Sequence, residues 1–238
     1  MAYDYFVNDI WDSGKIPSRI GERMVWGSDA DALVDNALFA WDSTAVTPTL
    51  DFIGNRACFA FTNSGSTATD GSQFQVTAAH IRPMEAKEIT LRWGYRGTTA
   101  TQDASFGLAA IDTSQIASAA TDYIKVEKLA ASTSFTLSAR KASGTAESFT
   151  LAGLTAVVDT WFDFCMRIKR SSTAGMGLVT VTAAVGGVPG GNLTTVFSES
   201  FATQLPDTVD LSPYGAWRAG SAANVSGYVP YFGWLYQG

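Results

Sequence analysis

Apolar and polar side chains alternate with a period of two along much of this chain. In Trp161–Arg170 and again in Glu88–Arg96, a large apolar residue occupies nearly every second position. Successive side chains of a strand point to opposite faces of a sheet, so this alternation is typical of strands that are buried on one face. The sequence therefore predicts an antiparallel β protein.

Clusters of glycine, serine, threonine and asparagine divide the chain from Ala57 onward into short segments. Strands are expected near residues 57–62, 72–82, 88–97, 104–112, 122–128, 134–142, 146–151, 161–170, 177–186, 193–198, 212–219 and 228–236. Short strands joined by polar turns suit two stacked sheets. No repeat of roughly 20 to 50 residues is visible, which argues against a propeller or a solenoid.

The first 56 residues have a different character, because they are acidic and aromatic and hold no sustained period. Eight of the sixteen aspartates lie before residue 52. Tyr3–Val7 alternates as a strand does, and within Ala30–Phe39 we expect one or two helical turns. We expect a single domain in which residues 1–56 form an extended arm with a first strand and residues 57–238 form the β-sandwich. Trp11 and Trp26 are then anchors of the arm at a subunit interface.

Charged residues make up only 16% of the chain, against roughly 25% in an average soluble domain. Partner subunits covering part of so uncharged a surface would explain this, and we expect a homo-oligomer. Exteriors rich in serine and threonine also occur on secreted monomers, which is the alternative. The net charge of −6 argues against binding to nucleic acid or to an anionic membrane.

The N-terminal residues Met1–Ile10 contain Asp4 and Asp9 and do not resemble a secretory signal. No apolar run approaches the ~18 residues of a membrane span. We therefore expect synthesis in a cytoplasm and no membrane partner. Cys58 and Cys165 are expected to be thiols packed in the sheets, although a disulfide between them remains open.

Residues for hydrolytic chemistry are scarce. The six glutamates include no close catalytic pair, and the two nearest candidates, Glu85 with Glu88 and the segment Tyr123–Glu127, contain lysines and indicate solvated strand edges. The only histidine, His80, has no neighbouring nucleophile motif. The sequence therefore predicts a protein that is not an enzyme and has no essential cofactor.

Calcium is the one metal for which the sequence offers ligands. Asp29, Asp31 and Asp35 cluster their carboxylates, but they lack the glycine and glutamate of an EF-hand. A solvated acidic loop or a helix start accounts for the same residues.

Several basic residues alternate with large apolar residues on their strands and are expected to face outward. Such a face could contact an acidic capsid surface or an anionic glycan, whereas scattered arginines paired with nearby aspartates are the alternative. These interface candidates are Arg92, Arg96, Arg140 and Arg167, together with Lys169.

The segment Leu154–Lys169, followed after a turn by Gly177–Val185, resembles two strands of concanavalin A-like jelly rolls. The closing strands Leu211–Trp217 and Val229–Leu235 are similar to the last strands of this fold in virion proteins of tailed bacteriophages. Those phage proteins often begin with an acidic and aromatic segment that is similar to Asp4–Asp9. The resemblance implies an all-β, two-sheet antiparallel jelly-roll sandwich.

The same resemblance implies a structural protein of a bacteriophage particle. We expect a capsid decoration or cement protein, most simply a trimer, that contacts the major capsid protein of the virion. The alternative is a carbohydrate-binding or lectin-like adhesion module of a phage fibre or spike. In that case a sugar would stack on aromatic residues such as Trp217 or Tyr214.

Overall fold

The computed structural model describes residues 23–26, 39–44, 48–53, 56–63, 67–76, 81–83, 86–110, 120–130, 132–174, 176–186, 194–201, 203–220, 225–230 and 232–237. These residues form strands only, and the predicted all-β class is confirmed. The strands are β1 (Arg23–Trp26), β2 (Phe39–Thr44), β3 (Pro48–Ile53), β4 (Arg56–Asn63), β5 (Gly71–Val76), β6 (Glu88–Gly97), β7 (Asp103–Ala110), β8 (Tyr123–Lys128), β9 (Ser134–Arg140), β10 (Glu147–Thr155), β11 (Phe162–Arg170), β12 (Gly177–Val185), β13 (Thr194–Phe201), β14 (Leu211–Arg218), β15 (Val225–Val229) and β16 (Phe232–Gln237).

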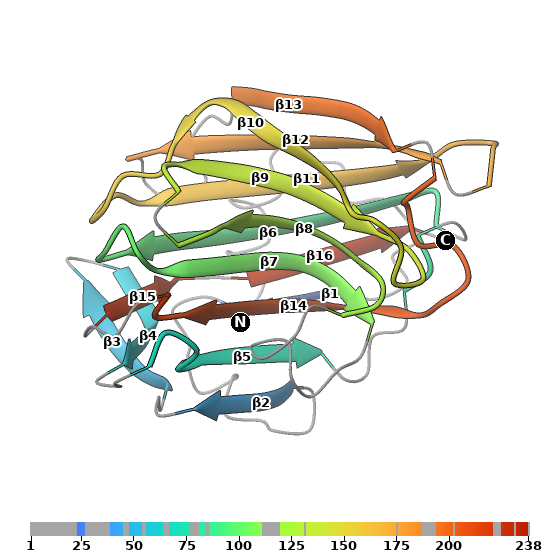
Figure 1. Ribbon diagram of the computed structural model, residues 1–238. Coiled ribbons are helices and arrows are strands. Elements are labelled where there is room, and N and C mark those ends of the chain that lie inside the picture. The colour runs from blue at the N-terminus through green and yellow to red at the C-terminus, as the bar shows by residue number, and fades with distance from the viewer. Residues whose placement is uncertain are drawn as a thin grey trace, which may run out of the picture.

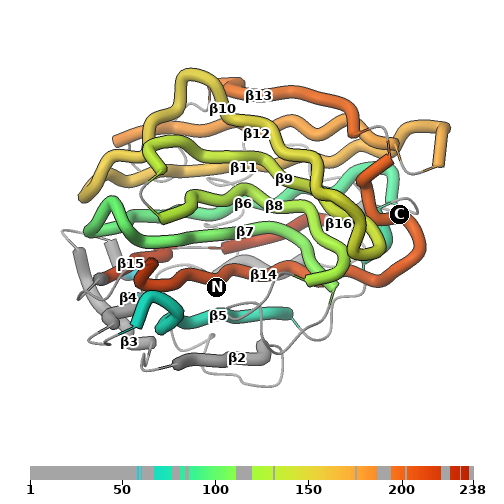
Figure 2. The backbone as a smooth tube through the Cα atoms, in the orientation of Figure 1, coloured from blue at the N-terminus to red at the C-terminus, as the bar shows by residue number. Residues whose placement is uncertain are grey.

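The strands form two antiparallel sheets that pack face to face (Figure 1). The front sheet has the order β10-β9-β8-β7-β14-β5-β2. The back sheet has the order β13-β12-β11-β6-β15-β4-β3, with β16 between β6 and β1. In Figure 2, the late strand β14 lies between β5 and β7, so segments far apart in the sequence are neighbours in the sheet. This arrangement confirms the predicted jelly-roll sandwich.

The C-terminal strand expected at 228–236 is split into two. β15 ends at Val229 and β16 begins at Phe232. Pro230 lies between them, and proline has no N–H to continue a ladder of hydrogen bonds. Both pieces still pair with β6, β16 along its first half and β15 at its end.

Three strands lie within the segment that the sequence predicts as an arm. β1 pairs with β16, β2 with the neighbouring strand β5, and β3 with β4. This part of residues 1–56 therefore belongs to the sandwich. The expected strand Tyr3–Val7 lies outside the described residues, as does the expected helical segment up to residue 38, and the boundary at residue 56 remains a prediction.

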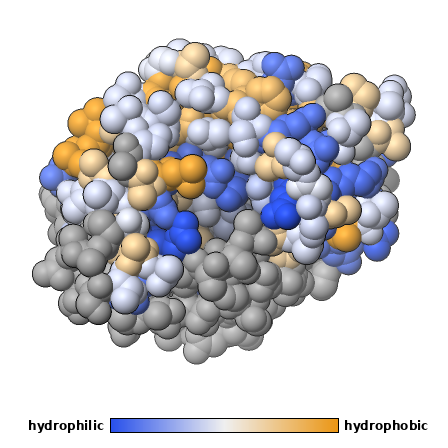
Figure 3. All heavy atoms as spheres, in the orientation of Figure 1, coloured by the Kyte–Doolittle hydropathy of each residue, from blue (hydrophilic) through white to orange (hydrophobic). Residues whose placement is uncertain are grey.

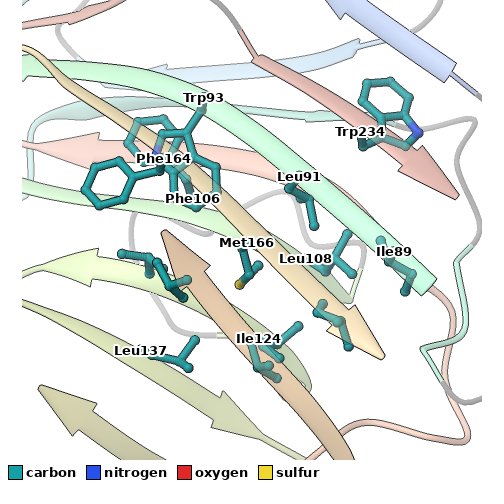
Figure 4. Close-up of a cluster of buried hydrophobic side chains, with 14 of the residues drawn as sticks. Ile89, Leu91, Trp93, Phe106, Leu108, Ile124, Leu137, Phe164, Met166 and Trp234 are labelled. Carbon is teal, nitrogen blue, oxygen red and sulfur yellow. The ribbon is translucent and has the colours of Figure 1, made fainter. Parts of the chain in front are cut away.

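The core lies between the sheets and is rich in aromatic rings (Figure 4). Trp93 of the back sheet stacks on Phe106 of the front sheet with ring centroids 5.7 Å apart, and on Phe164 of β11 at 5.2 Å. Each such buried side chain contributes about 1.5–3 kcal/mol by leaving water. Trp217 is also in this core and only 4% exposed, so it is not a platform for a sugar.

Cys58 and Cys165 are both buried, and neither forms a disulfide. In the described part of the chain, no helix is long and apolar enough to cross a membrane.

Candidate ligand-binding face of the front sheet

The outward face of the front sheet carries a row of mostly polar residues that crosses five strands. Gln75, Tyr214, Gly107, Lys125 and Ser138 lie opposite one another in β5, β14, β7, β8 and β9. Residues that are opposite one another in a sheet share a face. The residues that flank Gln75, Gly107, Lys125 and Ser138 along their strands pack in the core, so this row faces away from it.

A second row lies beside the first, and each of its residues is two positions away from the first-row residue of the same strand. It contains Gln73, Ala216, Ser105, Glu127 and Thr136. We call the outward residues of both rows the polar floor. Figure 3 views this side of the molecule, and hydrophilic residues gather across the middle of it.

Gly107 lets the two central strands of the floor approach each other closely. A Cβ atom at this position would lie 2.2 Å from the carbonyl oxygen of Ile124 and 2.7 Å from Cα of Lys125. Both are backbone atoms that cannot rotate away, so no larger residue fits without shifting β8. Tyr214 and Lys125 lie on either side of this glycine in the first row.

Tyr214 is 2% exposed although it lies on the outward face. Its hydroxyl donates a hydrogen bond to Oγ of Ser105 at 3.4 Å, from β14 to the neighbouring β7. Burial raises the pKa of Tyr214, while the nearby ammonium of Lys125 and the bond to Ser105 act in the opposite direction. The phenol is therefore neutral at physiological pH and fixed in place.

Lys125 and Glu127 form an ion pair at the centre of the floor. Nζ of Lys125 lies 2.5 Å from Oε2 of Glu127, and the two side chains are only 13% and 14% exposed. The same ammonium lies 4.6 Å from the ring centroid of Tyr123, which is a cation–π contact. Burial acts to lower the pKa of Lys125, but its electrostatic interactions with Tyr214 and Glu127 outweigh it, so this pKa is raised.

One end of the floor is closed by small apolar residues. Tyr123 and Tyr214 pack against Ala109, Ala120 and Ala216, with Ala146 partly buried against the same cluster. This cluster is separate from the main core. It packs around the two tyrosines, beside the largely buried pair of Lys125 and Glu127.

The other end of the floor is closed by an ion pair. Arg218 of β14 contacts Asp103 of β7 at 2.6 Å, and Asp103 also accepts a hydrogen bond from the amide of Ala130. Lys128, the next basic residue of β8, points to the other side of the strand and donates to the carbonyls of Ala100 and Gln102. Its burial lowers the pKa of Lys128.

The predicted metal ligands and the anchor Trp11 lie outside the described residues. This holds for Asp29, Asp31 and Asp35, and also for His80. In the described ranges, no three His, Cys, Asp or Glu side chains come close enough together to hold a metal ion. Trp26 is on β1, with its backbone opposite Phe232 of β16.

The four predicted interface arginines do not share one surface. Arg92, Arg96 and Arg167 are on the back sheet, whereas Arg140 is on the front sheet. Arg92 is only 6% exposed, so little of it reaches the surface. Arg96 lies between the rings of Trp161 and Tyr228 and contacts Asp159 at 2.9 Å. Their role at an interface remains a prediction.

The expectation that the segment Tyr123–Glu127 is a solvated strand edge is wrong. β8 lies inside the front sheet between β7 and β9, and Tyr123 is 6% exposed. Alternation with Ile124 and Val126 correctly indicates that the polar residues face outward. The order of strands in the sheet, which the alternation does not contain, brings Lys125 and Glu127 to the centre of the floor.

Compared by sequence, the chain matches no protein-family model and no curated protein. Compared by structure, it is similar to the lectin UEA-II in complex with galactose, with a TM-score of 0.56 at 10% identity over 92% of this chain and 100% of that one. It is also similar to a carbohydrate esterase of the Shiga toxin-encoding bacteriophage phi24B, with a TM-score of 0.54 at 10% identity over 90% and 98% of the two chains.

A third similar structure is the β-glucanase of Bacillus licheniformis, with a TM-score of 0.52 at 9% identity over 92% and 100% of the chains. Identities this low show a shared fold and transfer no activity. The chain has the jelly-roll fold of concanavalin A-like lectins and glucanases.

Proposed function

We propose that this protein is a carbohydrate-binding domain of the lectin type and that the sugar binds on the polar floor. The observation that carries the proposal is the mixture of fixed donors and acceptors there. Lys125 supplies N–H donors, Glu127 supplies acceptors, and the hydroxyls of Ser105 and Thr136 do both. Sugar hydroxyls also donate and accept, so a face of this composition suits them.

The fold supports a sugar as the class of ligand. The lectin UEA-II was solved with galactose, and this chain has the same architecture over nearly its whole length. The alternative ligand for so polar a face, nucleic acid, is disfavoured by the net charge of −6.

The protein binds its ligand without hydrolysing it in this proposal. A retaining glycosidase needs one protonated and one ionised carboxyl group about 5 Å apart. The outward carboxylates described near the floor are each engaged with a cation, Glu127 with Lys125 at 2.5 Å and Asp103 with Arg218 at 2.6 Å. Neither is placed as a free acid.

Binding to a panel of immobilised glycans tests this proposal. Thr136→Val removes one hydroxyl from the floor, and Thr180→Val is its matched control. Both threonines are half-buried and face outward on interior strands, but Thr180 is on β12 of the back sheet. We expect the wild-type protein and Thr180→Val to bind the same glycans and Thr136→Val to bind them several-fold more weakly. Failure of the wild-type protein to bind any glycan, or equal binding by both variants, would contradict the proposal.

A place in a bacteriophage particle is the second candidate, and an exposed apolar patch favours it. Leu129, Val157 and Val158 are 50%, 51% and 44% exposed. They lie on neighbouring loops, because the amide of Ala156 donates to the carbonyl of Thr133. Exposed large apolar residues at one end of a sandwich suit a contact with another subunit.

In this second proposal the protein is a homo-oligomer, most simply a trimer, that decorates the capsid through the major capsid protein. It is compatible with the first, because a glycan-binding domain can be displayed on a virion. Mass spectrometry of purified particles and light scattering of the isolated protein test it. Absence from the particles together with a monomer in solution would exclude it.

A further inference from the structure

Arg140 lies at the end of β9 on the outward face of the front sheet, opposite Tyr123. Its Nε donates to the carbonyl of Gly144 and its Nη2 to the carbonyl of Ser143, both at 3.1 Å. The ion pairs of the described residues all involve other cations. The guanidinium of Arg140 is therefore held by neutral carbonyls, and its charge is not balanced by a carboxylate in contact.

The turn that holds Arg140 has an unusual backbone. Ala142 and Ser143 have φ angles of 49° and 58°, in the left-handed region that non-glycine residues rarely adopt. Hydrogen bonds of 2.8 Å hold them there, from the amide of Ala142 to Oδ1 of Asp122 and from the amide of Ser143 to the carbonyl of Thr121. Strain that the surrounding structure maintains in this way is often found at binding sites.

The same contacts engage the carboxylate of Asp122, which lies against this turn. Asp122 is 4% exposed and its Oδ1 accepts from the turn amide, so it serves the turn and makes no ion pair with Arg140. The other carboxylate of the strand, Glu127, contacts Lys125. An incoming anion at Arg140 therefore displaces no existing ion pair.

Arg140 is adjacent to the polar floor. Tyr123 is opposite Arg140 and Lys125 is opposite Ser138, so Arg140 and Lys125 are diagonal neighbours on β9 and β8. Side chains on such diagonals are about 7–8 Å apart at their backbones, close enough for one ligand to contact both. A sugar ring on the floor would bring a substituent to Arg140.

A guanidinium carries more N–H donors than the two used here, and its planar edge matches a carboxylate or sulfate group. We propose that the polar floor selects an acidic saccharide, whose anionic group pairs with Arg140 while its hydroxyls contact the floor. This inference rests on the proposed carbohydrate binding and names the class of sugar. A neutral sugar would leave the cation of Arg140 unused.

Affinity electrophoresis in gels containing alginate, heparin or dextran tests the inference. Alginate carries carboxylates, heparin carries sulfates as well, and dextran is neutral, so the three gels separate the two sources of negative charge from plain sugar binding. We expect the wild-type protein to be retarded by alginate or heparin and not by dextran. The retardation should weaken as sodium chloride is added, because salt screens the ion pair.

Three variants locate the effect. Arg140→Gln should weaken binding to the acidic polysaccharide about tenfold or more, since a charge-assisted pair is lost. Arg140→Lys keeps the charge without the planar edge and should fall between. Arg167→Gln removes the same charge from the back sheet and should bind as the wild type does. Thermal melting of each variant reports whether it is folded.

The outcomes separate this inference from the proposed function. If a polysaccharide is bound through the floor but Arg140→Gln and Arg140→Lys bind it unchanged, or if dextran is bound as well as alginate and heparin, the acidic saccharide is wrong and carbohydrate binding stands. If no polysaccharide or glycan is bound, both proposals are wrong. If Arg140→Gln does not fold, Arg140→Lys and the salt dependence of the wild type still decide between an acidic and a neutral ligand.

Discussion

The ion pair between Lys125 and Glu127 offers a quantitative test of the polar floor. Lys125→Met keeps the apolar length of the side chain and removes its charge, which leaves the carboxylate of Glu127 only 14% exposed and without its partner. Leaving a buried polar group without its partner costs about 1–3 kcal/mol of the free energy of unfolding, and more when the group is charged and fully buried. Because some solvent reaches this carboxylate, we expect a cost of about 1–3 kcal/mol.

Glu127→Gln should also destabilise the protein, because it removes the counter-ion of Lys125 and leaves this ammonium against the ring of Tyr123. The double variant carries neither charge. Its cost should be smaller than the sum of the two single costs by about 0.5–3 kcal/mol, which is the range for directly interacting neighbours.

Urea unfolding at pH 7, followed by tryptophan fluorescence, gives the unfolding free energies of all four proteins of this cycle, and thermal unfolding gives their melting temperatures. The chain of 238 residues should unfold with an entropy of about 0.5 kcal/mol per degree, so each single variant should lower the melting temperature by about 2–6 °C. Single costs that simply add in the double variant would refute the reasoning. They would mean that solvent already screens the pair and that the floor is not rigid.

Three further predictions concern the floor and the core. The pKa of Lys125 is raised on folding, so the stabilisation by its charge should be complete below the ordinary lysine pKa of 10.5 and should be lost as pH rises through the pKa of the folded protein. The difference in unfolding free energy between wild type and Lys125→Met, measured from pH 7 to 11, should therefore stay constant up to about pH 10.5 and shrink only above it. Gly107→Ala should cost about 1–3 kcal/mol in urea unfolding because its Cβ would meet backbone atoms of β8, whereas Ser105→Ala on the same strand and face should cost less; equal costs would contradict the close approach. Phe164→Ala should lower the unfolding free energy by about 3–5 kcal/mol because it opens a cavity beside Trp93, while Lys169→Ala on the same strand should change it little. Calorimetry of both variants measures these changes, and a small loss for Phe164→Ala would mean that the ring is loosely packed.

Local patterns in the sequence predict most strands of this fold. β6 and β11 alternate for nine or ten residues, and alternation of that length is typical of a strand with one buried face. β1, β2 and β3 have only four to six residues, too few for a period to stand out, and the sequence pattern alone assigns them to an arm. Short strands are defined by their partners, which a local pattern does not contain.

The candidate site is predictable in part. Alternation around Lys125 and Arg140 indicates which way these side chains point, and both do face outward. The sequence does not reveal that Arg140 belongs to a different sheet from Arg92, because that depends on the order in which distant strands pair. The floor itself is assembled from β5, β7, β8, β9 and β14, so no single segment carries its pattern.

The position of the last strands has a consequence for how the protein is made. β14 joins β7 to β5 in the front sheet, and β15 joins β6 to β4 in the back sheet. Before residues 211–229 leave the ribosome, β7 and β5 have no strand between them in the front sheet, and β6 and β4 have none in the back sheet. Each sheet is then in two parts with unpaired edges. Such non-local pairing slows folding and leaves edges that attract other chains. Neither sheet can close before these strands emerge, so folding is completed only after residues 211–229 have been synthesised, and we expect products truncated before residue 211 to aggregate.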